Sequence, residues 1–114
     1  MAANLLAPVL KLSQKVINNR GVVTSDLALN GALTVSGPAD GTIFVYFNRL
    51  VQESSEEFDV VVQVASGATP KSIKLSKSDL KLLGNQKISA VAVYVKDDIA
   101  ETSEFIEFTL DTRT

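Results

Sequence analysis

Acidic side chains are the residues of this sequence whose types and spacing come closest to those of a chemical site. Asp97, Asp98 and Glu101 lie close together in the chain, and carboxylate oxygens of this kind are the ligands that Ca²⁺ prefers. The spacing does not match an EF-hand loop, and the group supplies too few oxygens unless Asp40 or a carboxylate from another loop converges on it. We therefore expect a solvated turn here and no metal site.

A second acidic group lies upstream in a polar segment, and its members are Glu53, Glu56, Glu57 and Asp59. Two carboxylates that flank a glycosidic bond can hydrolyse it. A polar hairpin tip accounts for the same residues without any chemistry, and we favour it. No glycine-rich phosphate cradle follows an expected strand, so we expect no nucleotide and no other cofactor.

The composition removes most of the familiar catalytic chemistries. The 114 residues include no cysteine and no histidine, which excludes a thiol nucleophile, a disulfide framework, an imidazole base and a zinc site of the usual ligands. The net charge of -2 provides no basic surface for nucleic acid. No apolar run approaches the roughly 18 residues that a membrane span needs. We expect one folded domain that is not an enzyme and that binds neither nucleic acid nor a membrane.

Residues 1–10 are largely apolar and superficially similar to the start of a signal peptide. No lysine or arginine precedes the apolar stretch, Pro8 interrupts it, and no small-residue cleavage site follows. We therefore expect no signal peptide and a protein that is made and used without export.

The rest of the chain is dominated by alternation of apolar and polar residues, which is typical of β-strands. Strands are expected at 42–48, 58–65, 71–75, 88–96 and 104–110, with one or two more within 21–24 and 27–35. The first two of these strands should pair as a hairpin. Asn30 and Gly31 could form a tight turn or a bulge, and 76–84 predicts a single helical turn. The expected class is all-β, as a two-sheet antiparallel sandwich.

The second half of this pattern resembles a known fold. A short strand, a one-turn crossover at Ser78, Asp79 and Leu80 that ends near Gly84, a long strand carrying Tyr94 and a final edge strand are similar to part of the immunoglobulin and fibronectin type III domains. The resemblance covers roughly the last two-thirds of the chain, without the tryptophan and the cysteine pair of antibody domains. It implies an immunoglobulin-like sandwich and no activity. Immunoglobulin-like domains of this size are also similar to bacteriophage virion proteins that decorate capsids or tails.

One sheet of such a sandwich should carry apolar residues on both faces. If Ile43, Val45 and Phe47 point inward, then Phe44 and Tyr46 point outward. The residues that would share that outer face are Val61, Phe105 and either the Ala90/Ala92/Tyr94 set or the Val91/Val93/Val95 set. Monomers rarely leave such a patch to water. Three explanations remain open: a partner interface, cover by the chain's own N-terminal segment, or a reversed assignment of inner and outer residues.

The N-terminal segment is the other unusual feature, because Leu5, Leu6, Val9 and Leu10 are apolar and no acidic residue occurs before Asp26. Residues 5–12 could form the first edge strand, with Pro8 where a missing N–H does no harm. Alternatively they form an extended arm that adds to a neighbouring subunit. We therefore divide the chain into an arm or edge strand, 1–20, and a sandwich domain, 21–114.

These features predict a non-enzymatic structural protein that acts through protein–protein contacts. We expect a subunit or decoration protein of a larger assembly, a bacteriophage capsid or tail, made in the host cytoplasm and located in the virion. Its partners would be capsid or tail proteins or copies of itself. The expected interface residues are Leu5, Leu6, Val9, Leu10, Phe44, Tyr46, Val61 and Phe105. The alternative is a cell-surface or enzyme-associated immunoglobulin-like module that recognises carbohydrate.

Overall fold

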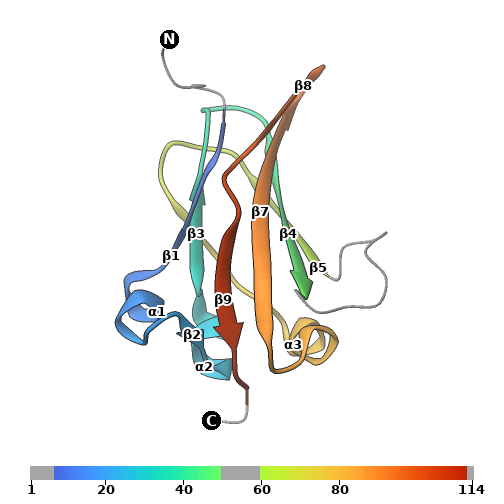
Figure 1. Ribbon diagram of the computed structural model, residues 1–114. Helices are drawn as coiled ribbons and strands as arrows, with labels where there is room; N and C mark the ends of the chain where they lie inside the picture. Colours follow the sequence, from blue (N-terminus) through green and yellow to red (C-terminus); the bar gives the residue numbers. More distant parts are fainter. Residues whose placement is uncertain (1–6, 50–59, 113–114) are drawn as a thin grey trace.

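The computed structural model describes residues 7–49 and 60–112 of the chain. Strands make up about half of this part, and three short helices connect some of them (Figure 1). The elements in chain order are β1 (Val9–Leu12), α1 (Gln14–Asn18), β2 (Val22–Val23), α2 (Ser25–Asn30), β3 (Leu33–Ser36), β4 (Thr42–Arg49), β5 (Val60–Ala65), β6 (Lys71–Ile73), α3 (Lys77–Leu83), β7 (Lys87–Lys96), β8 (Ile99–Thr102) and β9 (Ile106–Leu110). The expectation of an all-β protein is confirmed.

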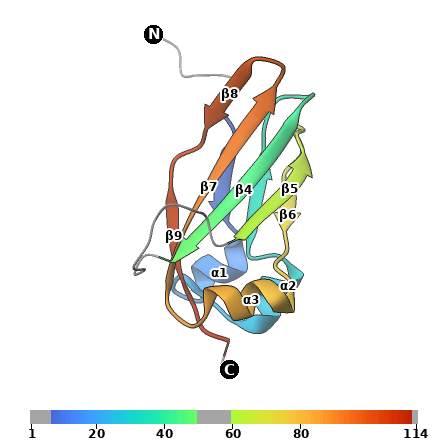
Figure 2. The same ribbon diagram turned by 90° about the vertical axis from the view of Figure 1, so that its right-hand side faces the viewer.

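The strands form two sheets that lie one behind the other when the molecule is turned to face β4 and β5 (Figure 2). The larger sheet has the order β2-β9-β7-β4-β5, with β8 also paired to β7. The smaller sheet has the order β1-β3-β6. All pairs are antiparallel except β2 with β9, which run parallel. The three helices gather at one end of the molecule (Figure 2).

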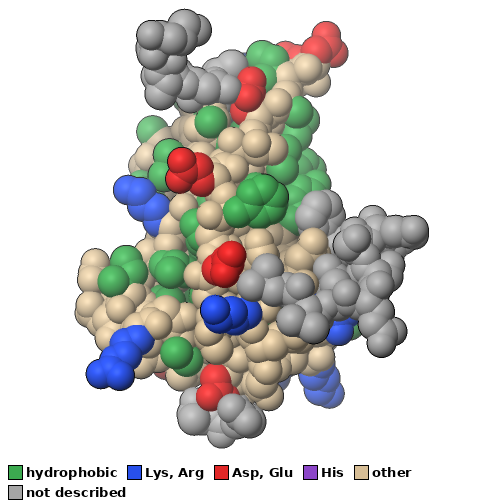
Figure 3. Space-filling model, in the orientation of Figure 1, with side chains coloured by type: hydrophobic (Ala, Val, Ile, Leu, Met, Phe, Trp, Pro, Cys, Tyr) green, Lys and Arg blue, Asp and Glu red, His purple; other side chains and the backbone are tan. Residues whose placement is uncertain are grey.

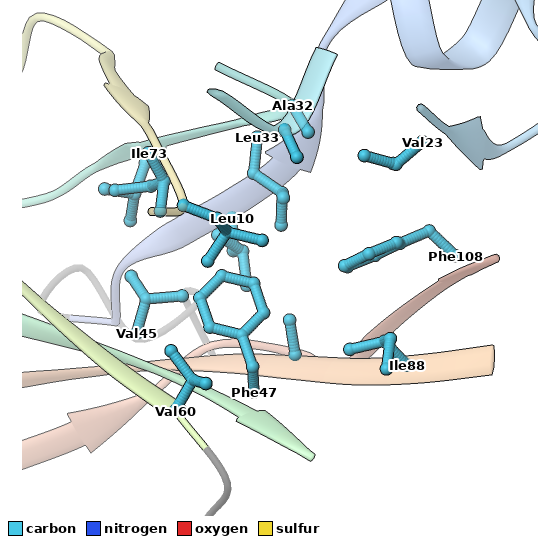
Figure 4. Packing of buried hydrophobic residues seen from close by; sticks show 14 of the residues in the cluster. Leu10, Val23, Ala32, Leu33, Val45, Phe47, Val60, Ile73, Ile88 and Phe108 are labelled. Carbon is cyan, nitrogen blue, oxygen red and sulfur yellow. The ribbon is translucent and has the colours of Figure 1, made fainter. Parts of the chain in front are cut away.

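Side chains from both sheets meet in one hydrophobic core. Alternation along β4 turns Ile43, Val45 and Phe47 inward, and each of them is nearly inaccessible to solvent. Leu33 and Ile73 approach from the smaller sheet, as Figure 4 shows. The ring of Phe47 contacts that of Phe108 edge to face, with centroids 6.3 Å apart, a favoured geometry for aromatic pairs.

Helix α2 overlaps the segment 27–35, where the sequence pattern predicted a strand, and that prediction was wrong for 27–30. Helix α1 lies in a segment for which no helix or strand was predicted. The Thr24 hydroxyl accepts a hydrogen bond from the Leu27 amide at 3.4 Å and caps the start of α2. Gly31 ends this helix with a φ of 118°, a conformation that favours glycine. Helix α1 has five residues and buries Val16, and α2 has six residues and buries Ala28. Because both helices are so short, the sequence shows no apolar stripe of helical period.

Helix α3 is longer than the single turn that the sequence predicted. It has seven residues and begins with a capping box. The Asp79 amide donates to the Ser76 hydroxyl at 3.1 Å, and the Ser76 amide donates to the Asp79 carboxylate at 2.9 Å. This reciprocal pair satisfies two amides that the first helical turn leaves unbonded. Leu80 and Leu83 then anchor the helix in the core.

The N-terminal segment packs against its own domain from Val9 onward. Strand β1 pairs antiparallel with β3, and the Ser13 amide extends this contact to the Ala32 carbonyl at 2.8 Å. Leu10 lies in the common core at 7% exposure. Of the two sequence-based alternatives, the edge strand is therefore the one adopted by Val9–Leu12. Leu5 and Leu6 lie outside the described residues.

Candidate functional site

The outer face of the larger sheet carries rows of apolar side chains that cross several strands. Paired residues of an antiparallel ladder lie on the same face. The first row consists of Val61, Tyr46 and Val91. The neighbouring row consists of Gln63, Phe44 and Val93, of which only Gln63 is polar. The register therefore resolves the open choice on β7 in favour of the Val91, Val93 and Val95 set. The alternate residues of β7, Ala90, Ala92 and Tyr94, point into the core.

This outer face exposes large apolar groups to solvent. Val61 is 53% exposed, and Phe105, immediately before β9, is 70% exposed. Phe44 and Tyr46 are half-buried, and their rings stack with centroids 6.4 Å apart and an interplanar angle of 27°. Val91 is only 5% exposed although it lies outside the core cluster, so its neighbours on the outer face cover it. Hydrophobic side chains run along the upper right of the molecule in Figure 3, on the side of β7 and β4.

A β-bulge lies directly before β9, in the segment that contains Phe105. Ala90 pairs with Ile106, and Ala92 pairs with Ser103. The segment from Ser103 to Ile106 therefore contains one residue more than the segment of β7 from Ala90 to Ala92. At the bulge the Ser103 amide donates to the Ala92 carbonyl at 2.8 Å, while the Ala92 amide donates to the Ser103 hydroxyl at 2.9 Å. A side-chain oxygen thus takes the place of a backbone acceptor, and the extra residue interrupts the alternation.

The bulge also corrects the prediction of one continuous last strand at 104–110. The observed strand β9 begins at Ile106, and Phe105 precedes it. Strand β8 was not predicted, because the bulge shifts its alternation relative to that of β9. The sequence-based assignment of Phe105 to the outer face assumed a continuous strand over 104–110 and stays a prediction.

The expected interface residues separate into different locations. Phe44, Tyr46 and Val61 share the outer face of the larger sheet. Phe105 is exposed immediately before β9 of the same sheet. Val9 is 47% exposed on β1, which belongs to the other sheet. The prediction of Leu10 as an interface residue was wrong, because its side chain fills the core. An unbroken apolar run offers no alternation that would distinguish inner from outer residues.

The acidic residues near the β7–β8 turn do not assemble into a metal site. The Asp40 carboxylate pairs with the Lys96 ammonium at 3.5 Å, and the Asp40 carbonyl accepts a hydrogen bond from the Tyr94 hydroxyl at 2.7 Å. Asp97 adopts a φ of 52° in the turn that joins the two strands. Within 7–49 and 60–112, no three acidic side chains lie close enough to hold a metal ion. The second acidic group, Glu53, Glu56, Glu57 and Asp59, lies outside the described residues.

A shallow hollow of about 300 Å³ lies beside α2, α3 and the end of the described chain. Its lining residues are Ser25, Leu29, Lys77, Leu80, Lys81 and Thr112. The Ser25 hydroxyl already donates to the Thr112 carbonyl at 3.2 Å. The lining supplies no carboxylate to act as a general base beside the two lysines, so the apolar sheet face is the stronger candidate.

Comparison with known proteins gave no relative: neither a protein-family model, nor a curated protein, nor a solved structure matched this chain. None of the helices in the described ranges has the length and apolar composition that crossing a lipid bilayer requires.

Proposed function

We propose that this protein is a non-enzymatic structural module that joins a larger protein assembly through the outer face of its larger sheet. The observation that carries the proposal is the apolar row of Val61, Tyr46 and Val91 across this face, in which Val61 is more than half exposed. Phe105, next to the start of β9, adds a second large exposed apolar side chain. A sheet that packs on another sheet needs only one apolar face for folding. A second apolar face indicates a surface that another protein covers.

The chemistry of the face favours a protein partner. Aromatic residues are enriched at the centres of protein interfaces, where charged residues are depleted. The stacked rings of Phe44 and Tyr46 lie on β4, between β5 and β7. The residues directly opposite Tyr46, Val61 and Val91, are uncharged. A partner with its own apolar surface would remove this row from water.

The proposed architecture is an immunoglobulin-like sandwich. Two sheets share one core, and α3 connects β6 in the smaller sheet to the long strand β7 in the larger one. Such domains are similar to proteins that decorate bacteriophage capsids or tails, and we therefore propose a virion as the assembly.

The proposal is tested by charging the face without disturbing the core. The variant Tyr46→Glu should remain folded and should fail to enter the large particles that contain the wild-type protein. Phe105→Ser provides a second test at a position that is 70% exposed. Thr34→Glu is the matched control, because Thr34 lies on the outer side of the central strand of the smaller sheet. Particle content is measured by sedimentation of cell extracts, and folding by urea denaturation.

Normal particle entry by both Tyr46→Glu and Phe105→Ser would contradict the proposal. A glycan array with and without Ca²⁺ tests the carbohydrate-binding alternative on the same proteins. Reproducible sugar binding that Tyr46→Glu abolishes would replace the structural role with carbohydrate recognition.

A further inference from the structure

Among the residues that the structure describes, strand β5 is an edge of the larger sheet that lacks the usual protective features. Proteins usually protect edge strands from pairing with other chains by means of charges, prolines or short length. Strand β1 contains Lys11, and β6 starts with Lys71 directly after Pro70. Strand β8 contains Glu101, and β2 has only two residues. Strand β5 has the sequence VVVQVA, with six residues and none of these devices.

The hydrogen-bonding pattern identifies the backbone groups that this edge presents. The Ser66 amide donates to the Gly41 carbonyl at 3.0 Å, one step beyond the pair of Ala65 with Thr42. Hydrogen-bonded pairs alternate along an antiparallel ladder. The residues whose N–H and C=O groups point away from β4 are therefore Val61, Gln63 and Ala65. Within the described ranges, β5 pairs with β4 alone.

We propose that β5 is a self-association edge, which pairs antiparallel with β5 of a second copy of this chain about a two-fold axis at Gln63. This register pairs every outward backbone group of β5. Gln63 faces its own copy, and Val61 faces the partner's Ala65. Both contacts join uncharged side chains, so no like charges meet. The two glutamine side chains each offer an amide donor and an acceptor to the other.

The sequence of the edge favours a second copy over an unrelated peptide, because the strand is complementary to itself. Apolar residues oppose apolar residues on both faces, since Val62 meets the partner's Val64 on the inner side. Isologous contacts of this kind close into a dimer and leave no free end for further growth. The dimer would continue the larger sheet of one copy into that of the other, with Val61 of each copy near the seam.

This inference goes beyond the proposed function, because it uses the edge of the larger sheet and not its outer face. The two proposals can therefore fail separately. A Tyr46→Glu variant that loses particle entry should still form the dimer, whereas a charged variant at Gln63, such as Gln63→Lys, should weaken the dimer and leave particle entry unchanged. Sedimentation equilibrium of the purified chain distinguishes the two states.

A single cysteine tests the register directly, because the natural chain contains none. Directly opposed residues in a hydrogen-bonded antiparallel pair have Cα atoms about 5.5 Å apart, within the range that a disulfide spans. Gln63→Cys should form a disulfide-linked dimer under mild oxidation at least roughly tenfold faster than Ser72→Cys, because pairing raises the local thiol concentration. Ser72 is the matched control, since it is exposed on the edge strand β6. Equal rates for the two variants would overturn the proposal.

A charge exchange at the same position tests the two-fold axis without a covalent bond. Gln63→Lys and Gln63→Glu should each weaken the dimer by about three- to tenfold, because like charges then lie opposite each other. Mixing the two variants should restore association, since each lysine then faces a glutamate. Gln63→Thr serves as the neutral control and should dimerise like the wild type. A monomeric wild-type chain at all concentrations, or no restoration on mixing, would refute the self-association edge.

Discussion

The two sheets of this protein share one core and differ in what they present to solvent. A row across the smaller sheet consists of Lys11, Thr34 and Ser72. The corresponding row across the larger sheet consists of Val61, Tyr46 and Val91. Both sheets bury the alternate residues of the same strands in the core. The smaller sheet demonstrates that this fold is compatible with a polar outer face, so folding alone does not account for the apolar face of the larger sheet.

The two faces of β4 provide the largest contrast. Phe47 is fully buried in the core, whereas Phe44 is half-buried on the outer face of the same strand. We expect Phe47→Ala to lower the free energy of unfolding by about 3–5 kcal/mol, because it leaves a cavity. Phe44→Ala should cost roughly 1 kcal/mol, since it removes only cross-strand contacts.

Urea denaturation of both variants measures this difference at constant temperature and pH. Equal losses of stability would mean that the outer face contributes to folding as much as the core does, and would remove the contrast between the two sheets.

The bulge in the segment that contains Phe105 should account for the next largest effect. Ser103→Ala removes a buried acceptor of the Ala92 amide and should lower the free energy of unfolding by about 1–3 kcal/mol. Ser72→Ala is the control, because Ser72 is exposed on the outer side of the smaller sheet; it should change stability by less than about 0.5 kcal/mol. A Ser103→Ala variant as stable as this control would show that the hydroxyl does not hold the bulge.

Helix α3 links the two sheets that are being compared, and its capping box should contribute a smaller amount. Ser76→Ala removes the hydroxyl that accepts from the Asp79 amide and should cost about 1 kcal/mol. Ser78→Ala, within the same helix, should be neutral or slightly stabilising, because alanine has the higher helix propensity. Thermal unfolding of the pair compares them, and a larger loss at Ser78 would contradict the assigned cap.

The smallest expected effect tests whether the smaller sheet requires its polar outer face. Thr34→Val replaces a half-buried polar residue with an apolar one of similar shape and should change the free energy of unfolding by less than about 0.5 kcal/mol. The variant should also enter particles normally. A large stabilisation, measured by urea denaturation, would indicate that apolar outer residues favour folding itself and would weaken the functional interpretation of Tyr46 and its neighbours.

The sequence predicted the parts of the fold that have regular alternation and missed those that tertiary contacts decide. Strands β4 and β7 were predicted within one residue at each end, because β-branched residues alternate along them. Helices α1 and α2 were missed because each is fixed by one cap and one buried residue. Strand β8 was missed because the bulge at Ser103 shifts its alternation relative to that of β9.

The candidate face was predictable in part for the same reason. Alternation placed Phe44, Tyr46 and Val61 on the outer side, but it left the face of β7 open because both of its sides are apolar. Only the register, which pairs Tyr46 with Val91, decides that question. Leu10 was misassigned, because its burial depends on the pairing of β1 with β3 and not on its neighbours in sequence.

Site-specific photo-crosslinking tests the central claim most directly. A photoreactive phenylalanine analogue is placed at Phe44 or Phe105 on the larger sheet, and at Thr34 or Ser72 on the smaller one, in cells that make the protein. The apolar face predicts cross-links to the same partner protein from Phe44 and Phe105, and none to it from the other two positions. Equal cross-linking from both sheets, or cross-linking from the smaller sheet alone, would contradict the assignment of the outer face of the larger sheet as the contact surface.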